Sequence, residues 1–399
     1  MTEVFAPSNA KQVAEVIVDA AAAGTTLDVR GGASKVDYGR PVDADAILDV
    51  SALSGVGLYE PEELVITVGA GTPMMEIQAT LADANQHLAF EPPDYDYVLG
   101  RAGGGATIGG VVACNLSGPR RIGAGAARDH ILGIAAISGR GDAFKSGGRV
   151  VKNVTGYDLS KLMAGSMGTL GVMTEITLKT LPSPEETRTV LAFGLDVTGG
   201  LGVLQRAAGS QAEVTGMAYL SSGSATGSSV GASQSVTALR LEGSGPSVAA
   251  RGKALSESLS VSKVEILDRE GSLTLWAEIR DCKMLRQTGY LWRISVPPAS
   301  GAEVATRIGA SCDAEFLFDW AGGLIWVVVD GDDSHPEDIR NALVGASGHA
   351  TLVRASKDTR REISVFQPQP EPLADLSGRI NEAFDPHGIL NPGRMVAGQ

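Results

Sequence analysis

The chain has 399 residues, which is more than one ordinary hydrophobic core holds, so two lobes are expected. Its formal net charge of −13 argues against non-specific binding to nucleic acid or to a membrane surface. The 3 cysteines form no CxxC pair, which argues against an iron–sulfur cluster or a cysteine zinc site on this chain alone. No run of about 18 apolar residues occurs, which argues against a transmembrane segment.

The N-terminal part alternates helical and strand-like patterns. Residues 1–10 lack the basic and apolar regions of a signal peptide, so a cytoplasmic protein is expected, with membrane association only through partners. Helical spacing from Asn9 predicts a helix that stops at Gly24. Further elements are predicted as strands at 27–29, 46–50 and 64–68 and a helix at 73–84. This alternation is typical of an α/β unit.

The first glycine-containing segment follows the strand predicted at 27–29. Gly31, Gly32 and Ala33 are consecutive small residues whose backbone N–H groups can form a concave nest for an anion. Ser34 adds a hydroxyl donor and Lys35 a positive charge, so a diphosphate is the expected ligand. The alternative is a tight turn between strand and helix, and the segment matches neither GxGxxG nor GxxxxGK[ST].

Two further glycine-rich stretches occur before residue 175. Gly109 and Gly110 lie inside the apolar run 107–116, where each glycine weakens a helix or strand by about 0.5–1 kcal/mol relative to alanine. Close approach of a flat ligand would explain that cost, although a structural loop is the alternative. The third stretch comprises 152–159 and 165–172. Three such segments in one unit indicate a large cofactor.

A second unit is predicted after Pro182 and Pro184, because two prolines so close together resist both helix and central strand. The serine- and glycine-rich segment 221–235 is the best candidate for mobility. Strands at 131–138 and 170–178 and a helix at 372–384 are predicted outside this unit. Within it, strands are predicted at 190–193, 238–241, 289–296 and 324–329, and helices at 197–208, 247–259 and 302–309. Antiparallel strands with helices are therefore expected in this unit.

Several motifs occur in the order found in FAD-linked oxidases and dehydrogenases. They are the nest at Gly31, then 107–110, 155–159, 168–172 and 389–394. The chain resembles that family, and within it the FAD-binding subunits of bacterial glycolate oxidase (glycolate dehydrogenase), through 117–121, 151–153 and 291–297. The resemblance implies the two-lobed α+β fold of the vanillyl-alcohol-oxidase class. It places an FAD-binding domain at 1–182, a smaller cap domain at 183–371 and a C-terminal segment at 372–399 that returns to the FAD domain.

The resemblance also implies where FAD lies. The diphosphate is expected on the nest from Gly31 to Lys35, the adenine end near Gly171, Val172 and Ile176, and the isoalloxazine near Asn391. The other residues implied along the cofactor are Pro92, Thr107, Gly109, Gly110, Asn115, Gly118 and Arg128. The nest has no histidine, and Cys114 stands where related dehydrogenases have a threonine, so a non-covalent FAD is expected.

The predicted cap domain carries two candidate cations for a substrate carboxylate. Arg280 and Arg293 resemble the cations of relatives that oxidise 2-hydroxy acids, and arginine holds carboxylates by two parallel hydrogen bonds. The alternative is that these arginines pair with Asp281 or Glu278. The segment 319–326 lacks the histidine pair that binds a metal in such relatives, so no metal is expected.

These features predict a flavin subunit that works with partners. The resemblance implies a glycolate dehydrogenase subunit that oxidises glycolate, a small 2-hydroxy acid, to glyoxylate beside a homologous catalytic flavin subunit and an iron–sulfur subunit. Two alternatives stay open: a stand-alone FAD-dependent oxidase of another small hydroxylated substrate, and a non-catalytic assembly subunit. No catalytic base is assigned.

Overall fold

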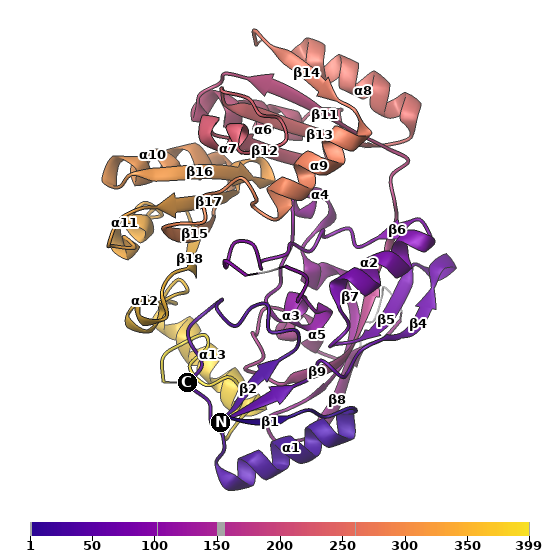
Figure 1. Cartoon of the computed structure of the whole chain (residues 1–399), viewed down its shortest axis with the longest axis vertical. Coiled ribbons are helices and arrows are strands. Elements are labelled where there is room, and N and C mark those ends of the chain that lie inside the picture. The colour runs from indigo at the N-terminus through magenta and orange to yellow at the C-terminus, as the bar shows by residue number, and fades with distance from the viewer. Residues whose placement is uncertain (1, 102, 150–155, 260, 399) are drawn as a thin grey trace. The chain divides into compact units, whose positions relative to one another are not determined.

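A computed structural model describes residues 2–101, 103–149, 156–259 and 261–398, and the chain divides into two compact units (Figure 1). Unit 1 comprises Met1–Ser117, Gly125–Ser183 and Arg360–Gln399. Unit 2 comprises Gly118–Ala124 and Pro184–Thr359. Among the described residues, no helix combines the length and the apolar character needed to cross a membrane.

The chain returns to unit 1 earlier than the sequence predicted, at Arg360 rather than at 372. Helix α12 (Lys357–Glu362) explains this boundary. The Arg360 guanidinium is buried, and it donates to the Gly39 carbonyl at 3.0 Å and to Asp37 Oδ1 at 3.1 Å. These partners belong to unit 1, so hydrogen bonds rather than apolar periodicity fix the return.

The first layer of unit 1 is a small parallel sheet with one helix against it (Figure 1). Helix α1 (Ala10–Ala23) begins at Asn9, whose side chain accepts from the Gln12 N–H, and ends at Gly24 with a φ of 67°. Its buried residues Val13 and Ile17 share a core with the sheet. The strands lie in the order β1 (Glu3–Phe5), β3 (Ala46–Asp49), β2 (Leu27–Arg30).

The second layer of unit 1 is a five-stranded antiparallel sheet. Its order is β4 (Val56–Glu60), β5 (Val65–Gly69), β9 (Val172–Lys179), β7 (Ile131–Ile137), β8 (Ala143–Gly147). The other elements of the unit are α2 (Met74–Asp83), α3 (Ile108–Ala113), α5 (Leu159–Met163), α13 (Glu371–Phe384) and the pair β6 (Gln86–His87) and β10 (Leu181–Pro182). Helix α3 contacts β9, which brings the glycine-rich run 107–116 onto this sheet.

Unit 2 is built on one eight-stranded antiparallel sheet. Its order is β14 (Val264–Leu267), β11 (Glu186–Phe193), β13 (Val236–Gly243), β12 (Gly216–Leu220), β16 (Ala314–Asp319), β17 (Leu324–Val329), β15 (Tyr290–Ser295), β18 (His349–Arg354). The helices are α4 (Arg121–Ala124), α6 (Val197–Ala208), α7 (Ser222–Thr226), α8 (Gly245–Ser258), α9 (Arg269–Arg280), α10 (Gly301–Ser311) and α11 (Pro336–Asn341). The α+β fold predicted for this part of the chain is confirmed.

The segment 221–235 contains a short helix, which the sequence prediction of a mobile loop missed. Ser221 caps α7 by accepting from the Ser224 N–H at 3.3 Å. The Ser224 hydroxyl then donates to Glu315 Oε1 at 3.2 Å. A five-residue helix has too few turns to leave an apolar period in a run of serine and glycine, so only its hydrogen bonds reveal it.

Candidate functional site

Two adjoining cavities in unit 1 collect most of the glycine-rich segments. The nest cavity is lined by residues 28–36 together with Cys114 and Arg394. The inner cavity is lined by residues 167–168 and 171–173 together with Val50 and Ala70. The residues that line both cavities are Val29, Gly31, Thr107, Gly110, Ala113, Met167 and Asn391. The shared wall shows that the two cavities are neighbours.

The nest cavity holds two buried cations. Lys35 is 7% exposed, and its Nζ donates to Ser34 Oγ at 2.9 Å. Burial lowers the pKa of Lys35, while Cys114, Asp94 and Asp96 act in the opposite direction. The Arg394 guanidinium, 8% exposed, donates to the Lys35 carbonyl at 2.5 Å. Buried cations beside consecutive backbone N–H groups fit an anionic ligand such as a diphosphate.

The glycines of the site differ in whether the surrounding structure leaves room for a side chain. A Cβ at Gly32 would lie 1.9 Å from the Gly105 carbonyl oxygen, and one at Gly109 would lie 2.7 Å from the Ala70 carbonyl oxygen. These two glycines are therefore required by packing. A Cβ at Gly110 would lie 3.5 Å from Thr107 Oγ1 and 3.7 Å from Lys35 Nζ, which are ordinary contacts. Gly110 is thus the position where a side chain would enter the cavities without disturbing the backbone.

Positive φ within the nest falls on Ala33, at 53°, rather than on Gly32. The left-handed conformation at a residue with a Cβ is uncommon and carries some strain. The glycines of this loop are therefore not the source of its positive φ. Gly31 and Gly32 instead allow the loop to pass close to Thr107 and Gly105.

Asn391 ties three segments together at the shared wall. Its Oδ1 accepts from the Val29 N–H at 2.7 Å, and its Nδ2 donates to the Met167 carbonyl at 2.8 Å. A Cβ at Gly168 would lie 2.6 Å from that Nδ2. Both ends of the Asn391 amide are thus used by backbone, so the residue holds the cavity wall in place.

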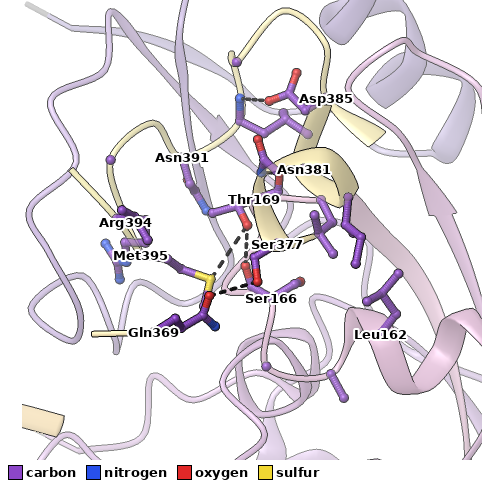
Figure 2. A pocket seen from close by; sticks show the side chains of 18 residues that line it. Leu162, Ser166, Thr169, Gln369, Ser377, Asn381, Asp385, Asn391, Arg394 and Met395 are labelled. Atoms are coloured by element: carbon purple, nitrogen blue, oxygen red, sulfur yellow. Dashed lines mark hydrogen bonds between the residues drawn. The ribbon is translucent and has the colours of Figure 1, made fainter. Parts of the chain in front are cut away.

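A third cavity of unit 1 is lined by α13 and the C-terminal tail (Figure 2). Asn381 Nδ2 donates to the Thr169 carbonyl at 3.1 Å, and buried Asp385 accepts from the Leu390 N–H at 2.8 Å. Asn391 and Arg394 line this cavity and the nest cavity alike. The C-terminal tail therefore contributes to both cavities, and Asp385 at the end of α13 helps to hold it.

Cys114 is the sulfur nucleophile nearest to the two cations. Burial raises the pKa of its thiol, although the charges of Lys35 and Arg394 act to lower it. The raised pKa keeps the thiol protonated and hence a poor nucleophile near neutral pH. Among the residues that the structure describes, no histidine lines the nest cavity or the inner cavity.

The predicted cofactor residues fall into two groups. The cavities bring together Gly31 to Lys35, Thr107, Gly109, Gly110, Gly171, Val172 and Asn391. They do not include Pro92, Asn115, Gly118, Arg128 and Ile176. Sequence reasoning missed Met167 and Arg394, although Arg394 ends the quoted motif 389–394.

Structural contacts account for several residues of the second group. Asn115 Oδ1 accepts from the Arg128 N–H at 3.1 Å, which closes a loop. The Gly118 carbonyl accepts from Trp320 Nε1 at 3.0 Å within unit 2. Ile176 pairs with Val68 and Ile134 inside the five-stranded sheet. The motif residues 151–153 and Thr155 lie outside the described residues.

The two candidate substrate cations of unit 2 have different surroundings. Arg280 makes two hydrogen bonds to Asp281, at 2.8 and 2.7 Å, as the alternative prediction allowed. Arg293 instead lies over the indole of Trp320, 5.1 Å from the ring centroid, and beside Trp326. Within the described part of the chain, no cluster of three or more His, Cys, Asp or Glu residues could hold a metal ion.

Comparison with known proteins identifies the family. Residues 2–147 match the FAD binding domain family. The chain is 37% identical over 382 residues to the glycolate oxidase subunit GlcE of Escherichia coli strain K12, covering 94% of this chain and 93% of that protein. It is 29% identical over 191 residues to the glycolate oxidase subunit GlcD of Bacillus subtilis strain 168, covering 48% of this chain and 39% of that protein.

Solved structures show the same fold at low sequence identity. The 4-ethylphenol oxidase from Gulosibacter chungangensis matches with a TM-score of 0.70 at 12% identity, covering 98% of this chain and 88% of that chain. An alkyldihydroxyacetonephosphate synthase matches with a TM-score of 0.69 at 14% identity, covering 98% and 75%. These structures confirm the predicted fold, and the family match confirms the FAD cofactor. The chain belongs to the family of the glycolate oxidase subunit GlcE, within the FAD-dependent oxidoreductases.

Proposed function

We propose that this chain is the FAD-binding subunit of a glycolate oxidase (glycolate dehydrogenase) complex that oxidises glycolate to glyoxylate. The observation that carries the proposal is the 37% identity to the glycolate oxidase subunit GlcE over 94% of the chain. On this proposal unit 1 is the FAD-binding domain and unit 2 is the cap domain.

The nest and inner cavities are the proposed place of FAD, held without a covalent bond. Lys35 and Ser34 would hold the diphosphate, with the backbone from Gly31 to Ala33. Gly171 and Val172 would meet the adenine end on the inner cavity, and Gly110 would face the middle of the cofactor. Bound FAD supplies a two-electron acceptor. The buried walls and the protonated Cys114 thiol favour reversible binding over covalent attachment.

Partners complete the proposed complex. A homologous flavin subunit would supply the substrate chemistry, because this chain lacks histidines in the segment 319–326 and has no assigned base. An iron–sulfur subunit would carry electrons onward, since the 3 cysteines of this chain form no cluster motif. The likeness to the glycolate oxidase subunit GlcD over 48% of the chain supports a homologous partner.

Two measurements test the proposal. Acid denaturation should release FAD into the supernatant, whereas flavin that stays on the precipitated chain would refute non-covalent binding. The native complex should then be purified by means of this chain, and its subunits should be identified by mass. A complex whose flavin is reduced anaerobically by glycolate is expected. Rapid reduction of the isolated chain by glycolate would instead favour a stand-alone enzyme, and absence of flavin would favour an assembly subunit.

A further inference from the structure

Strand β14 is the last strand on one side of the unit 2 sheet (Figure 1). On its inner side it pairs with β11, and the Phe193 N–H donates to the Lys263 carbonyl at 3.2 Å. Successive residues of an antiparallel strand direct their N–H and C=O groups alternately to the strands on either side. Those of Val264 and Ile266 therefore point outward, where the described part of the chain provides no further strand. Such an edge is able to pair with a strand of another chain.

The two faces of β14 differ in character. Lys263 and Glu265 lie on one face and form an exposed ion pair of 2.9 Å. Lys263 also lies over the Phe193 ring, with its Nζ 4.2 Å from the ring centroid. Val264 and Ile266 alternate with these charges and so project from the opposite face, where Ile266 is 41% exposed. The outward edge of β14 thus borders a charged face and an apolar face.

Helix α8 lies on the same side of the sheet as Ile266. Ile266 lies opposite Val190 of β11. Two residues earlier on β11, Arg188 lies opposite Leu241 of β13. A Cβ at Gly252 of α8 would lie 3.5 Å from the Leu241 side chain. Because directly opposed residues and residues two apart on one strand share a face, α8 covers the face from which Ile266 projects.

An open groove lies between α6 and the C-terminal end of α8. It has a volume of about 490 Å³, and its apolar lining includes Leu255, Leu259 and Val261. Val261 comes three residues before Val264, so the groove reaches the start of β14. Leu259 and Val261 are only partly buried. An apolar side chain placed beside this end of β14 would remove them from water.

The sequence of β14 is self-complementary in one antiparallel register. When Val264 lies opposite Val264 of a second copy, Lys263 of each copy lies opposite Glu265 of the other. Opposite charges directly across two strands stabilise their pairing. The next register that the outward backbone groups allow is centred on Glu265, and it would place two like charges opposite each other. The charges therefore favour the register centred on Val264.

We propose that β14 is a dimer interface, through which two copies of this chain pair about a two-fold axis and join their eight-stranded sheets into one. Backbone hydrogen bonds hold the two strands, and Lys263 and Glu265 set the register. Ile266 of each copy lies opposite Ser262 of the other, one residue from Val261, and packs at the groove of that copy. The interface depends on unit 2 alone and goes beyond the proposed function.

The oligomeric state of the purified full-length chain is the direct test. Sedimentation velocity over a range of protein concentrations is expected to show a reversible equilibrium between monomer and dimer. High salt should shift this equilibrium toward the monomer, because salt screens exposed charge pairs. A chain that stays monomeric at every concentration would overturn the proposal. Association through this edge only after a homologous flavin subunit is added would overturn it too.

Charge reversal tests the register. Glu265→Lys places lysines opposite each other in both charge pairs and is expected to weaken dimerisation by at least about tenfold. Lys263→Glu should have the same effect, whereas the double variant Lys263→Glu/Glu265→Lys restores opposite charges and should dimerise as the parent chain does. Glu303→Lys, at an exposed position on α10, makes the same change of net charge as Glu265→Lys and is the matched control. Dimerisation that neither single reversal affects would contradict the register.

Substitutions of Val264 give an independent readout. Val264→Pro removes an outward N–H without breaking a bond to β11, so a monomer that circular dichroism shows to be folded is expected. Val264→Cys should form a disulfide between copies on mild oxidation, because opposed residues of a hydrogen-bonded pair lie about 5.5 Å apart at Cα. Ile266→Cys is exposed but not opposite its own copy, so it is the control, and the parent chain gives the background from its own cysteines. A dimeric Val264→Pro chain, or equal cross-linking of the two cysteine variants, would refute the interface.

Discussion

The cations of the nest cavity in unit 1 have different surroundings from the paired arginines of unit 2. In unit 2, Arg120 makes two hydrogen bonds to Glu242, at 2.9 and 2.5 Å, and Arg280 pairs with Asp281 in the same way. In unit 1, Lys35 and Arg394 are buried at the nest cavity and have no ion pair among the described residues. A buried charge is costly without a partner. Paired cations therefore stabilise unit 2, whereas the cations of the nest cavity are left for a ligand.

Arg293 of unit 2 also has no ion pair among the described residues, which extends this comparison. It lies on Trp320 rather than on a carboxylate, and so resembles Lys35 more than Arg280 in its electrostatic surroundings. The comparison teaches that the absence of a counter-ion distinguishes a binding cation from a structural one. Substitution of paired cations or their acids should thus change stability, and substitution of Lys35 should change ligand binding.

The largest effect is expected at the acid that pairs the cations of unit 2. Glu242→Gln should lower the free energy of unfolding of unit 2 by about 3–5 kcal/mol, because it leaves Arg120 and Arg240 without their buried partner. Tryptophan fluorescence during urea unfolding measures this. The control Glu265→Gln breaks an exposed pair with Lys263 and should cost at most about 1 kcal/mol. Equal effects of the two substitutions would contradict the structural role of Glu242.

The pH dependence of the same pair is the next expected effect. Burial alone would raise the pKa of Glu242, but the charge of Arg240 and the hydrogen bonds and charge of Arg120 outweigh it and lower the pKa to about 2. Because the folded pKa lies below the unfolded one, this stabilisation is present above about pH 4.5 and is lost as the pH falls toward 2. It amounts to about 3 kcal/mol. The difference in unfolding free energy between the parent chain and Glu242→Gln should therefore shrink between pH 5 and pH 2.5, and a constant difference would contradict the shift.

Features with a short-range cause were predictable from the sequence. Helix α1 was predicted from its spacing after Asn9 and its end at Gly24, because apolar spacing and a terminating glycine are local signals, and the structure adds the cap at Asn9. The nest was predicted as a loop of small residues with a lysine. Which glycine leaves room for a side chain in the cavities was not predictable, since Gly32 is constrained by the carbonyl of Gly105, far away along the chain.

Features assembled from distant segments were missed. Strand β18 is buried at four consecutive residues, so its sequence has no period-2 alternation that would predict it, and its partner β15 is distant along the chain. The pairing of Arg280 with Asp281 could be offered only as an alternative, because the orientation of a helix C-terminus decides it. The stacking of Arg121 on Trp320 joins segments that no sequence motif links.

A side chain introduced at Gly110 tests whether FAD binds in the nest and inner cavities. Gly110→Leu is expected to weaken FAD binding by at least about 100-fold, because the side chain would fill the shared wall while making only ordinary contacts at its Cβ. Gly57→Leu, on an exposed edge of β4, is the matched control and should bind FAD normally. Gly32→Val is a poor probe, since its clash with Gly105 disturbs folding with or without FAD. Full flavin content in folded Gly110→Leu would place FAD elsewhere.

The smallest effect is expected when the unpaired cation of the nest loses its charge. Lys35→Met keeps most of the apolar stem but removes the donor to Ser34 and to a ligand anion. A hydrogen bond to a charged group contributes about 1.5–3 kcal/mol, so FAD affinity should fall about 10- to 100-fold. Since Lys35 has no acid partner among the described residues, its removal leaves no buried carboxylate unpaired, and the stability of the FAD-free chain should change little or rise.

Fluorescence titration of the FAD-free chain with FAD measures the affinity, and urea unfolding without FAD measures the stability. Lys11→Met, at an exposed position on α1, serves as the control for both. Loss of stability with unchanged FAD affinity would show that Lys35 supports the fold, as Glu242 does, and would remove the contrast between the two units.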